Sequence, residues 1–194
     1  MRCFGEGDAL YEQYHDAEWG RPVTDERGMY ERLCLEAFQA GLSWRTVLHK
    51  REAFREAFVG FDPERVARYG GRDLARLMKN EGIIRNRLKI EAAVSNARAL
   101  LALRDAGGSI VQLIWSFAPT RSPRRRAVAD MPAQTPASQA MSKALRAKGF
   151  RFVGPTTAYA TMQAAGLVND HVASCAVRAA VERERAATIK RFAS

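Results

Sequence analysis

Two pairs of cysteine and histidine residues, one near each end of the chain, have the residue types of a metal site. Cys3 and His15 lie near the start, with eleven residues between them, and His171 and Cys175 stand four apart near the end. On a helix, a spacing of four places both side chains on one face, where they can share an ion. Two cysteines and two histidines suit a closed tetrahedral zinc site better than a catalytic site, which keeps one position open. We therefore expect one structural metal ion that joins the two ends, and we look for the chemistry elsewhere.

A second candidate is a carboxylate close to several aromatic rings. Glu36 lies at the edge of an apolar helix face in the segment 35–44, which ends at Trp44. Together with Tyr11 and Tyr14 it could line a pocket for a flat, cationic ligand that donates hydrogen bonds, because rings attract cations and a carboxylate accepts from N–H groups. Core packing for Trp44 and a surface ion pair for Glu36 explain the same residues. The residue pattern alone favours that second interpretation.

A third candidate is the basic segment 82–90, which joins two expected helices. In a helix-hairpin-helix, a glycine with positive φ is followed by exposed backbone N–H groups at the start of the second helix, and these can hold a DNA phosphate. Gly82 stands at the turn, and Arg85, Arg87 and Lys89 add positive charge beside it. Any tight connection between helices has a similar pattern.

The elements that must position these residues are helices. Apolar residues recur at three- and four-residue spacing nearly throughout, and no segment shows the alternation typical of a strand, so we predict an all-α fold. Capping residues and glycines set the expected helix ends. The expected helices cover residues 30–38, 62–70, 73–82, 90–101, 110–117, 138–148, 155–165 and from 170 onward.

Two segments have no assigned chemistry. Residues 118–137 contain four of the seven prolines and a run of arginines, which is typical of a long exposed loop with solvated charges. The alternative is contact with a DNA backbone. The tail beyond Cys175 alternates arginine and glutamate and is expected to be a solvated helix.

Composition limits the class of protein. At 194 residues the chain fits one domain, and its net charge of +10 with a pI near 10.1 makes nucleic acid a candidate partner. A generally arginine-rich proteome would give the same charge. No apolar run is long enough to span a bilayer and no signal peptide is present, so we expect no membrane contact. Three widely spaced cysteines indicate a reducing compartment, and we expect a cytoplasmic protein.

Several of these segments, taken in order, resemble one family. The chain resembles bacterial DNA-3-methyladenine glycosylase I, an alkylation-repair enzyme of the helix-hairpin-helix superfamily. The resemblance covers nearly the whole chain from Cys3 to Cys175, and the matching stretches are 14–20, 35–44, 82–86, 142–145, 149–154 and 166–171.

The resemblance implies a fold, an activity and a set of site residues. The fold is a single helix-hairpin-helix glycosylase domain over residues 1–194, with the hairpin near 74–101, a zinc clasp formed by 3–15 and 171–175, and an extra C-terminal segment, 176–194. The activity is monofunctional hydrolysis of the N-glycosidic bond of 3-methyladenine, without lyase activity, in base excision repair of duplex DNA by a monomer. The implied zinc ligands are Cys3, His15, His171 and Cys175; Glu36 is the catalytic, base-recognising carboxylate; Tyr11, Tyr14, Trp19 and Trp44 bind the base; and Gly41, Leu42, Gly82, Arg85, Asn86, Arg87 and Lys89 contact DNA. Within this set, Gly41 and Leu42 form a wedge that enters the space left by a flipped nucleotide.

One departure from the family pattern affects the expected pocket. The family has a tryptophan two residues after the first zinc-binding cysteine, whereas here Phe4 directly follows Cys3 and no tryptophan is present. This leaves three alternatives to the main hypothesis: a glycosylase that prefers another lesion such as 3-methylguanine, a DNA-damage binder without turnover, and a zinc-stapled scaffold without a nucleic-acid partner.

Overall fold

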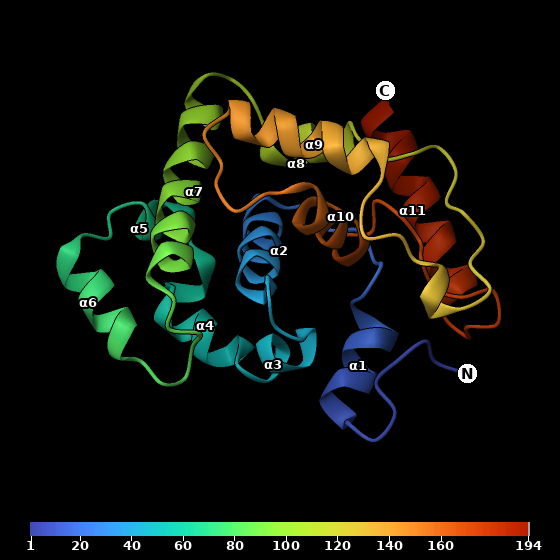
Figure 1. Cartoon of the computed structure of the whole chain (residues 1–194). Helices are drawn as coiled ribbons and strands as arrows, with labels where there is room; N and C mark the ends of the chain where they lie inside the picture. The colour runs from blue at the N-terminus through green and yellow to red at the C-terminus, as the bar shows by residue number, and fades with distance from the viewer. Residues whose placement is uncertain (194) are drawn as a thin grey trace.

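The central element of the molecule is the helix α2 (Glu26–Gln39), around which the other helices pack. The computed structural model describes residues 1–193, and within that range every regular element is a helix (Figure 1). The prediction of an all-α fold is therefore confirmed. Asp25 starts α2, because its carboxylate accepts a hydrogen bond from the N–H of Gly28.

The helices form two groups on either side of α2 (Figure 1). The middle of the chain forms one group, which contains the pair of helices expected for the hairpin. Its elements are α3 (Trp44–His49), α4 (Arg51–Ala57), η1 (Val59–Phe61), α5 (Pro63–Val66), α6 (Gly71–Lys79) and α7 (Arg87–Asp105). The two ends of the chain form the other group, with α1 (Ala9–Ala17), α9 (Pro136–Ala147), α10 (Pro155–Ala164) and α11 (Arg178–Ala193). Between the groups in sequence lie α8 (Ile110–Trp115) and η2 (Val128–Asp130).

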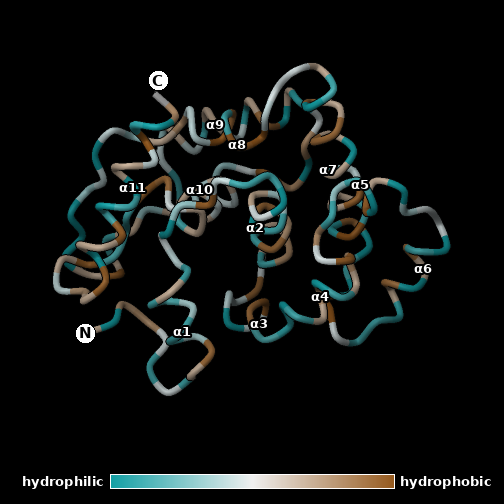
Figure 2. The backbone as a smooth tube through the Cα atoms, turned by 180° about the vertical axis from the view of Figure 1, so that it is seen from behind, coloured by the Kyte–Doolittle hydropathy of each residue, from teal (hydrophilic) through white to brown (hydrophobic). Residues whose placement is uncertain are grey.

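The core is built on α2, which is buried on nearly every side. Met29, Tyr30, Leu33 and Phe38 have no exposed surface, and the hydroxyl of Tyr30 donates to the carbonyl of Ala93 in α7 over 2.8 Å. Apolar and polar residues alternate along the helices (Figure 2), as expected when each helix buries one face. Within residues 1–193 no helix is long and apolar enough to cross a membrane.

Three predicted helix starts are wrong. The helix expected from residue 62 is one turn long, because α5 ends at Val66. Asp73 does not begin α6: the helix starts at Gly71, and Asp73 accepts from the N–H of Gly70 as the third residue of the helix. No helix begins at Asp170, because residues 169–177 form turns and α11 starts only at Arg178.

The loop and the tail are more integrated than their charge predicts. In the loop, Arg121, Arg124 and Arg126 are exposed as expected, but Arg125 turns inward to Asp170 over 3.2 Å. In the tail, Arg185 is fully buried and donates to the carbonyls of Leu167 and Pro119. The expectation of a solvated tail helix is therefore wrong, because α11 packs along α8.

Candidate active site and metal centre

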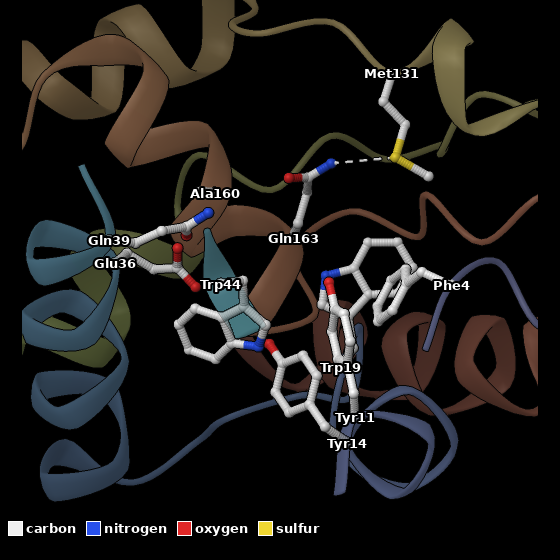
Figure 3. A pocket seen from close by; sticks show the side chains of 10 residues that line it. All are labelled: Phe4, Tyr11, Tyr14, Trp19, Glu36, Gln39, Trp44, Met131, Ala160 and Gln163. Carbon is white, nitrogen blue, oxygen red and sulfur yellow. Dashed lines mark hydrogen bonds between the residues drawn. The ribbon is translucent and has the colours of Figure 1, made fainter. Parts of the chain in front are cut away.

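A cavity of about 430 Å³ opens between α1, α2, α10 and the start of α3 (Figure 3). This volume is in the range of small-molecule sites. Four of the residues expected to bind a base line it, together with Glu36. The full lining is Phe4, Tyr11, Tyr14, Trp19, Glu36, Gln39, Trp44, Met131, Ala160 and Gln163.

Aromatic rings form one side of the cavity. Tyr14 and Trp44 lie 5.1 Å apart between ring centroids, and Tyr11 lies 6.5 Å from Tyr14. Phe4 lies 4.8 Å from Tyr11 and 4.9 Å from Trp19. The ring at the departure from the family pattern is therefore part of the pocket wall.

Glu36 is the acidic group of the cavity. Its residue is 5% exposed, and among residues 1–193 no side chain or backbone group hydrogen-bonds to its carboxyl group. Burial raises the pKa of Glu36 to about 8, against the opposing effect of the Arg32 charge. Glu36 is thus a neutral acid at pH 7 until a cation comes beside it, at which point the carboxylate form becomes favourable.

Trp44 supplies a donor without an acceptor. Its indole Nε1–H is buried, and no acceptor within the described residues 1–193 reaches it. A buried polar group without a partner costs free energy, roughly 1–3 kcal/mol. Glu36 and Trp44 therefore present an unpartnered carboxyl group and an unpartnered donor to one cavity, and a ligand with both acceptor and donor atoms on its edge would satisfy both.

Local sequence brings Glu36 and Trp44 together across a tight turn. α2 ends at Gln39, Gly41 adopts φ +81°, and the Ser43 side chain caps α3 by accepting from Thr46 N–H over 3.2 Å. Trp44 is the first residue of α3. Glu36 in the last turn of one helix and Trp44 at the start of the next therefore face the same space.

The end of α2 is held by an unexpected residue. The ammonium of Lys89 donates to the carbonyls of Phe38 and Ala40 over 2.9 and 2.6 Å. These carbonyls belong to the helix terminus, where intrahelical donors are missing. Lys89 is 7% exposed, and burial lowers its pKa. The structure thus places Lys89 behind the turn at Gly41, not on the surface with Arg85 and Arg87.

Asp8 joins the two helices that carry the rings. It caps α1 by accepting from Tyr11 N–H over 3.2 Å, and it accepts from Arg45 and His49 of α3 over 2.6 and 2.7 Å. The hydrogen bond from His49 is the largest cause that lowers the pKa of Asp8 to about 2. The tyrosines of α1 and Trp44 of α3 are therefore fixed relative to each other by one carboxylate.

The turn after α2 also carries the expected wedge. Leu42 is 45% exposed, and a Cβ added at Gly41 would meet no atom within 4 Å. A second hollow of about 550 Å³ lies between this turn and the start of α10, and it shares Glu36 and Gln39 with the first cavity. A nucleotide that enters the pocket could pass through this hollow.

The hairpin between α6 and α7 differs in detail from its prediction. Gly82 does not adopt a positive φ; an added Cβ there would lie 2.9 Å from the Ala53 Cβ, so close approach explains the glycine. Arg85, Asn86 and Arg87 are exposed, and the Asn86 side chain caps α7 by accepting from Lys89 N–H over 3.2 Å.

The hairpin still offers backbone donors. Within residues 1–193 the backbone N–H groups of Arg87 and Leu88, the first two of α7, have no acceptor. Free N–H groups at a helix start are suited to an anion.

The four expected metal ligands meet in space. One donor atom from each of Cys3, His15, His171 and Cys175 lies within 4.8 Å of every other. The Cys175 Sγ is 3.5 Å from His15 Nε2 and 3.3 Å from His171 Nδ1, and the Cys3 Sγ is 3.6 Å from His171 Nδ1. A tetrahedral zinc site with ordinary bond lengths has nitrogen–sulfur separations of roughly 3.5 Å. This group could therefore hold a metal ion.

The surroundings of the cluster also suit a metal. His15 Nδ1 lies 2.7 Å from Asp16 Oδ1, and His171 Nε2 lies 3.0 Å from the Trp19 carbonyl, so the other nitrogen of each ring faces the sulfurs. Burial lowers the pKa of His171 to about 4, which favours the neutral imidazole that ligates metals. Burial also raises the pKa of the Cys3 thiol to about 12, so a thiolate there needs a cation beside it.

The spacing of His171 and Cys175 works through a turn, not through the expected helix. The N–H of His171 donates to the Asn169 side chain over 3.3 Å, and the N–H of Cys175 donates to the Val172 carbonyl over 2.9 Å. Such local side-chain bonds compete with helix formation. The two side chains nevertheless converge.

Sequence reasoning missed four further lining residues. Gln39 stands one helical turn after Glu36, and that spacing could have identified it. Met131, Ala160 and Gln163 come from distant segments, and no local pattern marks them.

Comparisons with known proteins point in one direction. The methyladenine glycosylase family model matches residues 4–179. The DNA-3-methyladenine glycosylase of Haemophilus influenzae is 47% identical over 178 residues, which are 90% of this chain and 96% of that protein. A crystal structure of 3-methyladenine DNA glycosylase I is 49% identical, with a TM-score of 0.88 over 91% of this chain and 98% of the other. A variant of 3-methyladenine DNA glycosylase I in complex with 3-methyladenine is 36% identical, with a TM-score of 0.85 over 91% and 96%.

Proposed function

The chain belongs to the methyladenine glycosylase family, and from that premise we propose that it hydrolyses the N-glycosidic bond of 3-methyladenine in alkylated DNA. One observation of the site carries this proposal. The unpartnered carboxyl group of Glu36 and the unpartnered N–H of Trp44 face one cavity walled by aromatic rings.

This site fits the chemistry of a 3-methylated adenine. The base is flat and cationic, its exocyclic amino group donates hydrogen bonds, and its ring nitrogens accept them. Base–aromatic stacking contributes about 1–3 kcal/mol per base, and a desolvated cation–π contact about 2 kcal/mol. The cation also favours the ionised form of Glu36, whose pKa is raised only because its surroundings are apolar.

Recognition supplies most of what the reaction needs. The positive charge makes the base a good leaving group: the bond from the sugar to the base breaks, and its electron pair neutralises the base. Water then adds to the sugar carbon and loses a proton, which leaves an abasic site. The protein must extrude and hold the base, and unstacking costs a few kcal/mol, less for a damaged base.

The proposal includes contact with duplex DNA. The net charge of +10 favours phosphate binding by counterion release. Leu42 is exposed beside the cavity as a wedge must be, and the exposed side chains of Arg85 and Arg87 flank the free backbone N–H groups of α7. We further propose that the protein acts as a monomer in the cytoplasm, where its three free cysteines would stay reduced.

We also propose that the metal is zinc, one ion per chain. Cys3, His15, His171 and Cys175 would fill all four tetrahedral positions, which leaves none for substrate, so the ion would supply a crosslink between the chain ends. The crosslink also supports the pocket, because Phe4 follows Cys3 and Trp19 accepts from His171.

Replacement of Glu36 tests the proposed function. Wild-type protein incubated with methylated duplex DNA should release 3-methyladenine, detected by chromatography, and leave abasic sites. Glu36→Gln should lose most of this excision and keep its fold and metal, whereas the exposed control Glu52→Gln should keep full activity. Undiminished release by Glu36→Gln would refute the role of Glu36.

The same assay separates the alternatives. Preferential release of 3-methylguanine would indicate a different lesion preference. Binding to methylated DNA without abasic sites would indicate a damage binder, and affinity for DNA that does not change with salt would indicate a scaffold without a nucleic-acid partner.

A further inference from the structure

The side chain of Gln163 has a fixed orientation in the wall of the cavity. Its Nε2 donates to Asp170 Oδ2 over 2.8 Å and lies 3.8 Å from the sulfur of Met131. Both amide hydrogens therefore have an acceptor. In Figure 3 the side-chain oxygen points to the side of the cavity that carries Glu36 and Gln39. Among residues 1–193 no group donates to this oxygen.

A buried carboxylate behind the wall sets this orientation. Asp170 has no exposed side-chain surface, and its Oδ1 accepts from Arg125 Nε over 3.2 Å. Its Oδ2 accepts from the Tyr159 hydroxyl over 2.6 Å as well as from Gln163. A carboxylate paired with an arginine only accepts hydrogen bonds, so an amide facing it must present its nitrogen. A turned amide would set two oxygens against each other.

We propose that Gln163 is a specificity-determining residue, whose oxygen accepts a hydrogen bond from the exocyclic amino group of a 6-aminopurine, and that Asp170 is its positioning residue. This inference rests on the proposed function of the cavity. Glu36 and Gln163 then give the cavity two hydrogen-bond acceptors for the same edge of the base. A 6-oxopurine such as 3-methylguanine carries a carbonyl oxygen at that edge, and this oxygen meets acceptors in place of donors.

The first test removes the amide. Gln163→Leu keeps the size of the side chain but has no acceptor, and Met131→Leu is the matched control from the same wall. We expect Gln163→Leu to slow release of 3-methyladenine from methylated duplex DNA about 10- to 100-fold, as for loss of a hydrogen bond to a charged partner. Release of 3-methylguanine should change less than threefold, whereas Met131→Leu should leave the ratio of the two rates unchanged. An equal loss for both bases with Gln163→Leu would overturn the proposal, because a merely structural residue would give that result.

The second test turns the amide around. In Asp170→Asn, the new amide nitrogen can take the place of Oδ2 and donate to the Gln163 oxygen, so Gln163 can direct its own N–H₂ into the cavity. The release rate of 3-methylguanine relative to 3-methyladenine should then rise at least tenfold above wild type. In the double variant Asp170→Asn/Gln163→Leu, this ratio should return to that of Gln163→Leu alone.

The controls of the second test are independent of the proposed function. Metal content and thermal unfolding show whether Asp170→Asn keeps the neighbouring His171 in place; if the variant does not fold, the ratio for Gln163→Leu decides the proposal. A Asp170→Asn variant that folds with wild-type specificity would refute the positioning role. Failure of the wild-type protein to release any methylated base would instead refute the proposed function itself.

Discussion

Replacement of Lys89 by methionine distinguishes a DNA contact from a structural one. The basic segment 82–90 predicts that Lys89 binds a phosphate together with Arg85 and Arg87. In the structure its ammonium instead bridges the carbonyls of Phe38 and Ala40 at the end of α2. Methionine keeps the length of the aliphatic chain and removes the charge and the donors.

The structural role predicts a loss of stability of moderate size. A hydrogen bond from a charged donor contributes about 1.5–3 kcal/mol, and Lys89→Met leaves two carbonyls without this donor. The ammonium itself is partly desolvated, as its lowered pKa shows, and this offsets part of the loss. We expect the free energy of unfolding in urea to fall by about 2 kcal/mol. The turn at Gly41 should also loosen, so excision should decrease more than binding of undamaged duplex.

The salt dependence of duplex binding separates the two roles. Each phosphate contact contributes about −0.9 to the slope of log affinity against log salt concentration. Lys89→Met should leave this slope unchanged, whereas Arg87→Met, at an exposed position, should reduce its magnitude by about 0.9 and keep wild-type stability. A slope that falls with Lys89→Met while the free energy of unfolding stays constant would refute the structural reasoning.

Three further predictions follow from buried groups. Because burial raises the pKa of Glu36 from 4.5 to about 8, the native state keeps a proton that the unfolded chain releases, so the wild type should lose stability relative to Glu36→Gln as pH rises from about 4.5 to 8, by roughly a few kcal/mol; equal pH dependence of the two Tm values would contradict this. Cys175→Ser should reduce zinc content below one per chain, lower Tm and weaken base binding through Phe4 and Trp19, as measured by metal analysis and fluorescence titration with 3-methyladenine; full zinc occupancy would refute the ligand assignment. Arg185→Met should lower the free energy of unfolding by about 3 kcal/mol, because it leaves buried carbonyls unpaired, while the exposed Arg183→Met should have no measurable effect.

Residue types and helical spacing predict the parts of this structure that depend on local pattern or on family resemblance. The all-α class follows from periodicity, and the cavity contains Glu36, Tyr14 and Trp44 together as the resemblance implies. The ligand types at the two chain ends likewise predict a metal cluster, and its four residues do converge.

Features that depend on distant partners could not be predicted. Lys89 has the sequence context of a surface cation, and only the packing of α7 against α2 places it at the helix end. The turn at His171 forms because the Asn169 side chain competes with the helix, and no propensity reveals that outcome. Gln163 enters the site because Asp170 meets it across a turn, which is tertiary information.

The turn after α10 sends three consecutive side chains to three different parts of the molecule. Asn169 donates to the Arg178 carbonyl and to Glu182 of α11, Asp170 holds Gln163 at the cavity, and His171 belongs to the metal cluster. Insertion or deletion of one residue here would therefore displace the tail, the pocket wall and the clasp at once. The loop at 118–137 is different, because most of its arginines end in solvent. Changes of length during divergence should accordingly be accepted in that loop and excluded from the turn at 169–171.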